Sequence, residues 1–268
     1  MISFITICYN AEKDIAKTLK SVLDQTYSDF EYIIIDGNSK DKTLEIVNKY
    51  KNKFIEKGIP LTIKSEPDKG VYDAMNKGID IAQGEWINFI NAGDCFYSEN
   101  CIDLFFQKEI ASDIDYCYGD TIEVYHFGEI LLSQNKQLKK NIIMPFCHQS
   151  VFVRTNLLKQ YKFNSKYKIL GDHDLFYRLK KDGRKSEFRP VVISKYDATQ
   201  GLSANNPLAL HLERLQIYHI NNKWYYPFAI IYVYMRQGLI QPLKNILPRN
   251  IVNYIMAYRR SKQSKNGY

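Results

Sequence analysis

A single carboxylate, Asp94, follows an apolar segment in the stretch INFINAGDC, residues 87–95. The segment reads as a buried strand that ends in Asn91, Ala92 and Gly93 just before the acid. Asn, Gly and Asp are common turn residues, so a surface turn would explain this pattern. A ligand site would explain it equally, because Mg²⁺ and Mn²⁺ favour oxygen ligands, and Mg²⁺ commonly takes one or two carboxylates plus substrate phosphates.

Polar residues also follow the three strand-like segments that precede this one. They are Tyr9 and Asn10, then Asp36, then the segment from Glu66 to Lys69. In open parallel sheets, ligands bind beyond the carboxyl ends of the strands. If the four segments are parallel, these side chains and Asp94 should converge at one edge of a sheet.

The first 90 or so residues alternate between strand-like and helix-like segments. The expected strands are 2–8, 31–36, 61–66 and 85–90. Apolar residues at helical spacing predict helices over 11–25, from about 41, and around 71–82, with Asn10 as the N-cap of the first. This alternation predicts an α/β fold whose parallel sheet has helices on both faces.

After Asp94 the pattern is less regular. A strand pair is expected at 114–125 and 128–133, a strand at 148–154, and a helix over 172–183 that Gly183 stops. His148 lies at the start of that strand, and Asp172 opens that helix.

Two common phosphate-binding motifs are missing from the sequence. The segment after the first strand, CYNAEKD, has no glycine, so the dinucleotide motif GxGxxG is absent, and no GxxxxGK[ST] loop occurs. Phosphates would therefore need another partner. A divalent cation held by Asp94 would supply one.

The composition is that of a globular protein, with 45% apolar and 14% aromatic residues among 268. No run approaches the roughly 18 consecutive apolar residues of a membrane-spanning helix, and the N-terminus lacks the features of a signal peptide. The five cysteines form no CxxC pair, which favours a reducing cytoplasm.

The positive charge is concentrated near the C-terminus. The whole chain carries +8, yet nine Lys and Arg residues and no acid lie from Arg214 onward, which leaves residues 1–213 close to neutral. Residues 206–268 combine these cations with Trp, Tyr, Phe and Ile, and we expect an amphipathic helical region on an anionic membrane surface. A helical lid with a solvated polar face is the alternative, and the composition does not favour nucleic acid.

Several stretches together resemble family 2 glycosyltransferases. They are ITICYNAEKDIAKTLKSVLDQTYSDFEYIIIDGNSKDKT, SEPDKGVYDAMNKGIDIAQGEWINFINAGD, CHQSVFVR and GDHDLFYRL. The resemblance covers roughly residues 1–200 and is strongest to the subgroup that builds bacterial O-antigen and colanic-acid-type surface polysaccharides. It implies a GT-A fold over residues 1–205, with a nucleotide-sugar half at 1–97 and an acceptor and catalytic half at 98–205.

The resemblance also implies roles for particular residues. Asp36 corresponds to the acid that hydrogen-bonds uracil, in a pocket lined by Tyr9 and Asn10, and Asp68 and Lys69 fall where the family contacts the nucleoside. Asp94 corresponds to the metal ligand, for Mn²⁺ or Mg²⁺. Asp172 corresponds to the catalytic base. Asn91 is expected among the residues that bind the donor. His148 is expected either to contact the diphosphate or the acceptor, or to be a hydrogen-bonded histidine near the sheet.

Each role has a simpler structural alternative. Asp36 could form an Asx-turn, and Asp172 could cap its helix. Asp174 is expected either to cap that helix or to pair with Arg178 four residues on. The sequence also departs from the family pattern, since Gly37, Asn91, Gly93 and Gly171 stand where relatives carry acids.

The expected function is inverting transfer of a sugar from a UDP-sugar to a saccharide on a polyprenyl diphosphate carrier, at the cytoplasmic face of the cell membrane. A synthase of polyprenyl-phosphate sugars differs only in its acceptor. A non-catalytic module that binds nucleotide sugar or lipid is the third interpretation.

Overall fold

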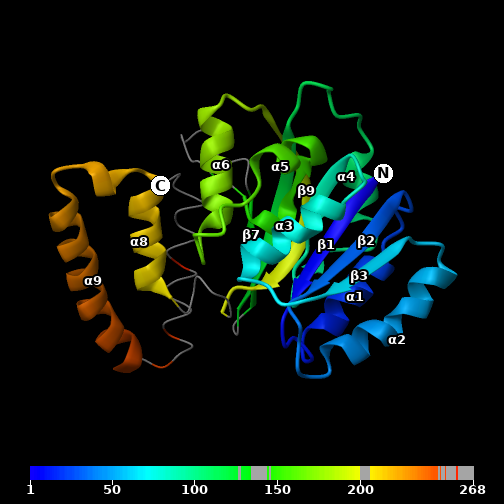
Figure 1. The fold of residues 1–268 in the computed structure, drawn as a ribbon, viewed down its shortest axis with the longest axis horizontal. Coiled ribbons are helices and arrows are strands. Elements are labelled where there is room, and N and C mark those ends of the chain that lie inside the picture. The colour runs from blue at the N-terminus through cyan, green and yellow to red at the C-terminus, as the bar shows by residue number, and fades with distance from the viewer. Residues whose placement is uncertain are drawn as a thin grey trace.

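Figure 1 shows a computed structural model of the chain, which describes residues 1–125, 128–133, 144, 146–199, 206–246, 248, 251 and 258. In chain order the elements are β1 (Ile2–Cys8), α1 (Ile15–Leu23), β2 (Phe30–Asp36), α2 (Thr43–Glu56), β3 (Leu61–Ser65), α3 (Val71–Ile81), β4 (Trp86–Phe89), β5 (Cys95–Phe96), α4 (Cys101–Phe106), β6 (Tyr116–Tyr125), β7 (Gly128–Leu132), η2 (His148–Ser150), β8 (Val151–Arg154), α5 (Thr155–Tyr161), α6 (Gly171–Lys181), β9 (Ser186–Asp197), α8 (Pro207–Ile217), η3 (Ile220–Asn222) and α9 (Tyr226–Ile246).

The described strands form a nine-stranded sheet in the order β3-β2-β1-β4-β8-β6-β9-β5, with β7 paired to β6. Strands β1 to β4 are the four that the sequence predicts. They are mutually parallel, because β1 pairs in parallel with β2 and β4, and β2 with β3. Their carboxyl ends therefore lie at one edge, as expected.

The alternation of side chains along the strands builds a core on each face of the sheet. Ile2 and Phe4 of β1 pack in the core that includes α1 and α2. Ile5 and Ile7 of the same strand pack in the core that includes α3, α5 and α6. Side chains two apart share a face of a strand, which is why one apolar run serves both cores.

The second half of the sheet is mixed, and the sequence predicts it less completely. The pair β6 and β7 is antiparallel, as expected. Residues 148–150 form a 3₁₀ turn, so the strand expected from His148 begins only at Val151. Strand β9 has no counterpart in the prediction, because Arg189 and Pro190 interrupt its apolar pattern. It pairs in parallel with β6 through an irregular register.

Helices α8 and α9 form a hairpin beside α6, with α9 outermost (Figure 1). Ile217 of α8 is buried against Tyr167 and Leu170, which lie in the loop before α6. Within the part of the chain that the structure describes, no helix has both the length and the apolar character that a membrane crossing needs.

Candidate active site

Asp36 ends β2 opposite Cys8, the last residue of β1, and its side chain is fully buried. Both carboxylate oxygens accept hydrogen bonds from the chain itself. Ser65 Oγ donates to Oδ2 at 2.6 Å, and Ser39 donates to Oδ2 through its backbone N–H at 3.0 Å and to Oδ1 through its hydroxyl. The Asp36 side chain therefore fixes the loop of residues 36–39 at the end of β2, by a backbone contact three residues on and not the two of the expected Asx-turn.

Tyr9, Asp68 and Gly37 meet just beyond Asp36. A Cβ atom on Gly37 would lie 2.4 Å from Asp68 Oδ2 and 3.3 Å from the Tyr9 ring. The glycine that replaces the family's second acid thus leaves space that Asp68 occupies. Tyr9 is 63% exposed, which makes its ring available to a ligand. Lys69 is also exposed, and its backbone N–H donates to Asp73.

Asn10 connects the loop after β1 to the loop after β2. Its Oδ1 accepts from the backbone N–H of Lys40 at 2.8 Å, and its own N–H donates to Ser39 Oγ at 2.9 Å. Its φ of 47° is left-handed, and α1 begins only at Ile15. Asn10 is therefore not the N-cap of that helix, which is a correction to the sequence prediction, and it fixes the two loops together.

The turn that carries Asp94 is fixed by a threonine of α1. Thr18 Oγ1 accepts from the N–H of Gly93 at 2.9 Å and donates to the carbonyl of Asp94 at 2.7 Å. Gly93 has a φ of 101°, a conformation that favours glycine. The N–H of Ala92 donates to the carbonyl of Ile7 at 3.2 Å, so the turn starts beside the end of β1.

Asp94 is half-buried, and its Oδ2 accepts from Gln149 Nε2 at 3.0 Å. Burial raises the pKa of the Asp94 carboxyl, although His148, Gln149 and Lys17 oppose the shift. A carboxylate held in this way benefits from an additional positive partner, because burial penalises its charged form.

His148 lies between the strand-end turn and Asp172. Its Nε2 is 2.9 Å from Asn91 Nδ2, and its Nδ1 is 3.8 Å from Asp172 Oδ2. When the amide donates to Nε2, the imidazole carries its proton on Nδ1, which faces the carboxylate. Three predicted residues, Asn91, His148 and Asp172, are thereby joined in one chain of polar contacts that begins three residues before Asp94.

Asp172 lies in the first turn of α6 and contacts α3 as well. Its Oδ1 accepts from the N–H of His173 at 2.7 Å and from Tyr72 Oη at 3.3 Å. A Cβ atom on Gly171 would lie 2.7 Å from the Tyr72 ring. The glycine that replaces the family's glutamate is therefore required by the packing of Tyr72 against the start of α6.

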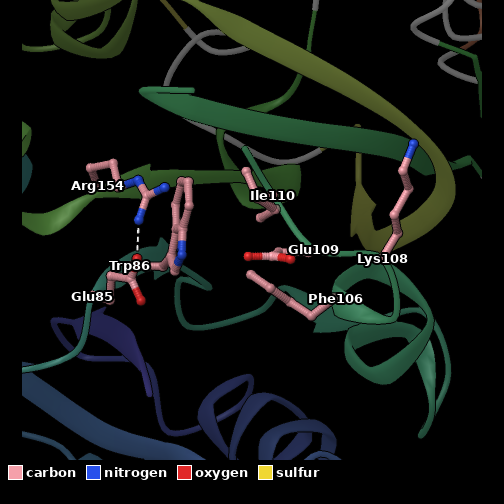
Figure 2. A pocket seen from close by; sticks show the side chains of 7 residues that line it. All are labelled: Glu85, Trp86, Phe106, Lys108, Glu109, Ile110 and Arg154. Atoms are coloured by element: carbon pink, nitrogen blue, oxygen red, sulfur yellow. Dashed lines mark hydrogen bonds and ion pairs between the residues drawn. The ribbon is translucent and has the colours of Figure 1, made fainter. Parts of the chain in front are cut away.

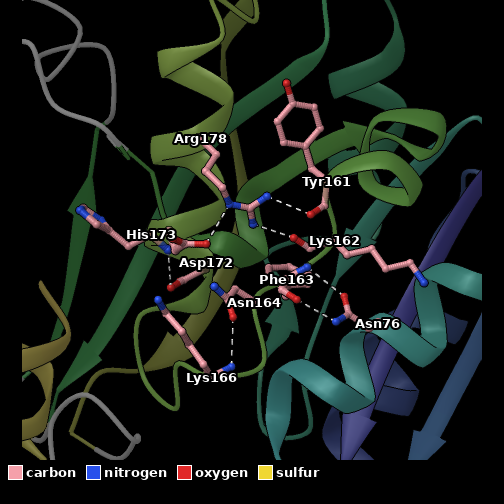
Figure 3. Close-up of polar contacts among 10 residues, drawn as sticks. Asn76, Tyr161, Lys162, Phe163, Asn164, Lys166, Asp172, His173 and Arg178 are labelled. Atoms are coloured by element: carbon pink, nitrogen blue, oxygen red, sulfur yellow. Dashed lines mark hydrogen bonds and ion pairs between the residues drawn. The ribbon is translucent and has the colours of Figure 1, made fainter. Parts of the chain in front are cut away.

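Figure 3 shows how α6 is held one to two turns beyond Asp172, at Arg178. Arg178 donates to the carbonyls of Tyr161 and Lys162 at 2.9 and 2.7 Å, at the end of α5. Its Nε also donates to Asp174 Oδ2 at 2.9 Å, which confirms the expected pair. These contacts fix α6 to α5 and do not involve Asp172, so Asp174 and Arg178 have a structural role.

A divalent cation fits the donor set at this edge only if substrate phosphates complete it. No group of three His, Cys, Asp or Glu side chains suited to a metal occurs among the described residues. Asp94 offers one carboxylate. Asn91 Oδ1 is buried and accepts no hydrogen bond from the described chain, so it is a second free oxygen. Mg²⁺ commonly binds through so few protein ligands when phosphates supply others.

A small pocket of 220 Å³ lies elsewhere, around Trp86 and Arg154 (Figure 2). Trp86 is the first residue of β4, so this pocket is at the amino end of the strand whose other end leads to Asp94. Arg154 covers the Trp86 ring at 4.0 Å and forms an ion pair with Glu85. The volume of this pocket is below the roughly 300 Å³ usual for ligand sites.

Three residues of this site are missing from the sequence prediction. Thr18 and Tyr72 lie inside helices where they read as ordinary helix residues, and Gln149 lies inside a segment that reads as a strand. Gln149 could have been found from its position next to His148. Thr18 and Tyr72 have no such signal, because their partners are 75 and 100 residues away in the chain.

Comparison with known proteins identifies the family. Residues 3–161 match the description "Glycosyl transferase family 2". The chain is 32% identical over 211 residues to the PGL/p-HBAD biosynthesis glycosyltransferase of Mycobacterium tuberculosis, which covers 76% of this chain and 79% of the relative.

Solved structures share the fold at lower identity. TarS 1-349 of S. aureus in complex with UDP-GlcNAc has a TM-score of 0.61 and 22% identity, covering 81% of this chain and 65% of that one. The chain spans 38% of the length of a longer TarS structure. The mannosyltransferase PcManGT of Pyrobaculum calidifontis, in complex with GDP-Man and Mn²⁺, has a TM-score of 0.66 and 13% identity, covering 98% and 86%. The chain therefore belongs to glycosyl transferase family 2 and is a glycosyltransferase with the GT-A fold.

Proposed function

We propose that the protein transfers a sugar from a UDP-sugar to a saccharide on a polyprenyl diphosphate carrier, with inversion at the anomeric carbon. The bacterial surface-polysaccharide context, O-antigen or colanic-acid-type, is part of this proposal. The observation that supports it best is the linkage of Asp172 through His148 to Asn91, in the same turn as Asp94. The reaction has a leaving diphosphate and an attacking hydroxyl. Asp94 would serve the diphosphate, and Asp172 would serve the hydroxyl.

Asp172 is the catalytic base of the proposed reaction. The acceptor hydroxyl is a weak nucleophile, and it must lose its proton as it attacks the anomeric carbon. A single displacement from the face opposite the diphosphate inverts the configuration, by the logic of inverting glycosidases. Tyr72 and the N–H of His173 hold Oδ1, which leaves Oδ2, the oxygen facing His148, to receive the proton.

Asp94 and Asn91 would hold the divalent cation together with the donor diphosphate. When bound, Mg²⁺ or Mn²⁺ neutralises charge that develops on the departing diphosphate. Gln149 and Thr18 fix the carboxylate and its turn, so Asp94 needs little reorganisation. The GDP-Man and Mn²⁺ in the PcManGT complex support a metal-assisted reaction.

The uridine would bind at the ends of β1 and β2. Tyr9 supplies an exposed ring and Asp68 a carboxylate, above Asp36 and beside the loops that Asn10 fixes. Lys69 lies in the loop that follows β3, and it is exposed. The UDP-GlcNAc complex of TarS supports UDP as the nucleotide.

The acceptor side of the proposal includes a membrane surface. Trp224 lies in the turn just before α9, and Phe228 and Tyr232 lie in its first two turns; they are 83%, 65% and 64% exposed. No acid lies from Arg214 onward, so the region suits anionic lipid headgroups. We place the protein on the inner face of the cell membrane, where a lipid-linked acceptor would reach Asp172.

A UDP-release assay tests this function. We expect one member of a UDP-sugar panel to release UDP in the presence of Mn²⁺ and vesicles containing a polyprenyl-diphosphate saccharide, and EDTA to stop the release. NMR of the product should show the opposite anomeric configuration to the donor. Turnover with polyprenyl monophosphate alone would favour the synthase alternative. Thermal stabilisation by GDP-sugars and by no UDP-sugar would overturn the donor assignment.

A further inference from the structure

Glu213 of α8 binds three consecutive backbone N–H groups in the loop just before α6. Its Oε1 accepts from the N–H of Lys168 at 2.8 Å, and its Oε2 accepts from Ile169 and Leu170 at 3.0 and 2.8 Å. A charged acceptor makes stronger hydrogen bonds than a neutral one, and three donors on one carboxylate fix the backbone closely. The contact joins segments more than 40 residues apart.

The segment that Glu213 holds leads directly into Asp172. Leu170 donates its N–H to Glu213, and its carbonyl accepts the N–H of Asp174, the first hydrogen bond of α6. On the other side, Tyr72 Oη donates to the carbonyl of Ile169 at 2.8 Å and also reaches Asp172. The loop is therefore held between Tyr72 of α3 and Glu213 of α8.

A second contact from α8 reaches the residue after Asp172. His173 Nε2 and Tyr218 Oη, just beyond the end of α8, are 2.9 Å apart. Burial lowers the pKa of His173, even though the adjacent Asp172 opposes the shift. Ile217 packs against Leu170 in the same region. The polar and apolar contacts of α8 thus converge on the start of α6, around Asp172.

We propose that Glu213 is a positioning residue for Asp172. It fixes the backbone of residues 168–170, and through it the first turn of α6, so that the Asp172 carboxylate stays within reach of Tyr72, His148 and the acceptor hydroxyl. This inference rests on the proposed role of Asp172 as the base. It makes α8 part of the catalytic apparatus, although the sequence places α8 with the basic C-terminal region.

Glu31 provides a matched control, because it makes the same kind of contact far from Asp172. Its Oε1 accepts from Ser3 Oγ at 2.6 Å and from the N–H groups of Gln83 and Gly84 at 2.6 and 3.0 Å. Ser3 pairs with Glu31 near the amino ends of β1 and β2, at the opposite edge of the sheet from Asp36. Replacing either glutamate removes a charged acceptor of three donors.

The experiment compares Glu213→Gln, Glu31→Gln and Asp172→Asn in the full-length protein. UDP release with the active UDP-sugar gives kcat and KM, calorimetry with UDP and Mn²⁺ gives nucleotide affinity, and thermal melts give stability. We expect Glu213→Gln to lower kcat by about 10- to 100-fold, since a misplacement of about 1 Å can cost that much, while UDP affinity stays within about twofold. Glu31→Gln should lower Tm without lowering kcat.

Hydrogen exchange at the amides of residues 168–170 gives a readout independent of turnover. We expect faster exchange there in Glu213→Gln and unchanged exchange in Glu31→Gln. A Glu213→Gln enzyme with wild-type kcat, or equal losses of kcat in both glutamate variants, would overturn the positioning role. Wild-type turnover by Asp172→Asn would instead overturn the proposed base, so the two failures are distinguishable.

Discussion

The proposed nucleotide side and the proposed base side of this site, at Asp36 and at Asp172, hold their carboxylates in different ways. Asp36 is held by Ser39, three residues away, and by Ser65 on the adjacent strand. Asp172 is held by Tyr72, 100 residues away, while Glu213 fixes its preceding loop. The first arrangement follows from neighbouring parallel strands and short loops. The second requires that α3, α6 and α8 all pack correctly.

Under the proposed function, this difference separates the residues that would bind the nucleotide from those that would carry out the chemistry. Loops after parallel strands are positioned by the sheet ladder, so the nucleotide side needs few additional contacts. In the proposed reaction, Asp172 must instead be placed against an acceptor that approaches from the face opposite the diphosphate. Contacts between distant segments provide that placement, and each can be removed singly while the sheet remains.

The largest expected effect comes from Asp172→Asn. Loss of a general base lowers turnover by roughly 10²- to 10⁴-fold, whereas UDP binding at the β1 and β2 ends should be unchanged. UDP release and UDP titration calorimetry measure the two properties separately. A variant that keeps turnover but loses UDP affinity would reverse the comparison between the two sides.

Asp94→Asn should lower turnover by about 100-fold or more and should abolish the Mn²⁺ dependence of UDP binding. It should also stabilise the protein at pH 7, because burial raises the pKa of Asp94 in the fold. The native state then binds more protons than the unfolded chain, so wild-type stability falls as pH rises from the unfolded pKa through the folded one.

Thermal melts at several pH values check this sign. The stability advantage of Asp94→Asn should be present at pH 7 and should disappear below a pH of about 4, where the carboxyl is neutral in both states. If Asp94→Asn is less stable than wild type at pH 7, this would contradict the inference that burial destabilises the charged form of Asp94.

Gly171→Ala should have an intermediate effect on turnover, about tenfold, and should cost about 1–3 kcal/mol of folding free energy. The added methyl group would lie 2.7 Å from the Tyr72 ring, which must move and carry its hydroxyl away from Asp172. Gly238→Ala in α9 is the control, since no atom lies within 4 Å of its added Cβ. Equal behaviour of the two alanine variants in melts and UDP release would argue against the Tyr72 contact.

The smallest effect on chemistry is expected from Trp224→Ser combined with Phe228→Ser. UDP release from a water-soluble acceptor should be nearly unchanged, but recovery with anionic vesicles in flotation should fall by about fivefold, as apolar burial is lost. Ile55→Ser in α2 is the control, because Ile55 is 58% exposed and lies far along the chain from α9. Equal vesicle recovery of both variants would remove the membrane surface from the proposal.

Most of the parallel half could be predicted from sequence. The apolar runs, the helical spacing and the acids at the strand ends gave β1 to β4 and their common edge, and these are confirmed. Strand β9 was missed because Arg189 and Pro190 disrupt the pattern that marks a strand. The 3₁₀ turn at His148 was missed because its residues read as part of the next strand.

The residues of the site can also be separated into those that could be predicted from sequence and those that could not. That Asp94 and Asp36 lie at one edge of a sheet followed from the sequence, because parallel strands leave no other place for their carboxyl ends. That His148 reaches Asp172, that Tyr72 excludes a side chain at Gly171, and that Glu213 holds residues 168–170 depended on tertiary structure. Local patterning determines strands and their ends, whereas contacts between segments 40 to 100 residues apart depend on how whole helices pack, which no short stretch of sequence specifies.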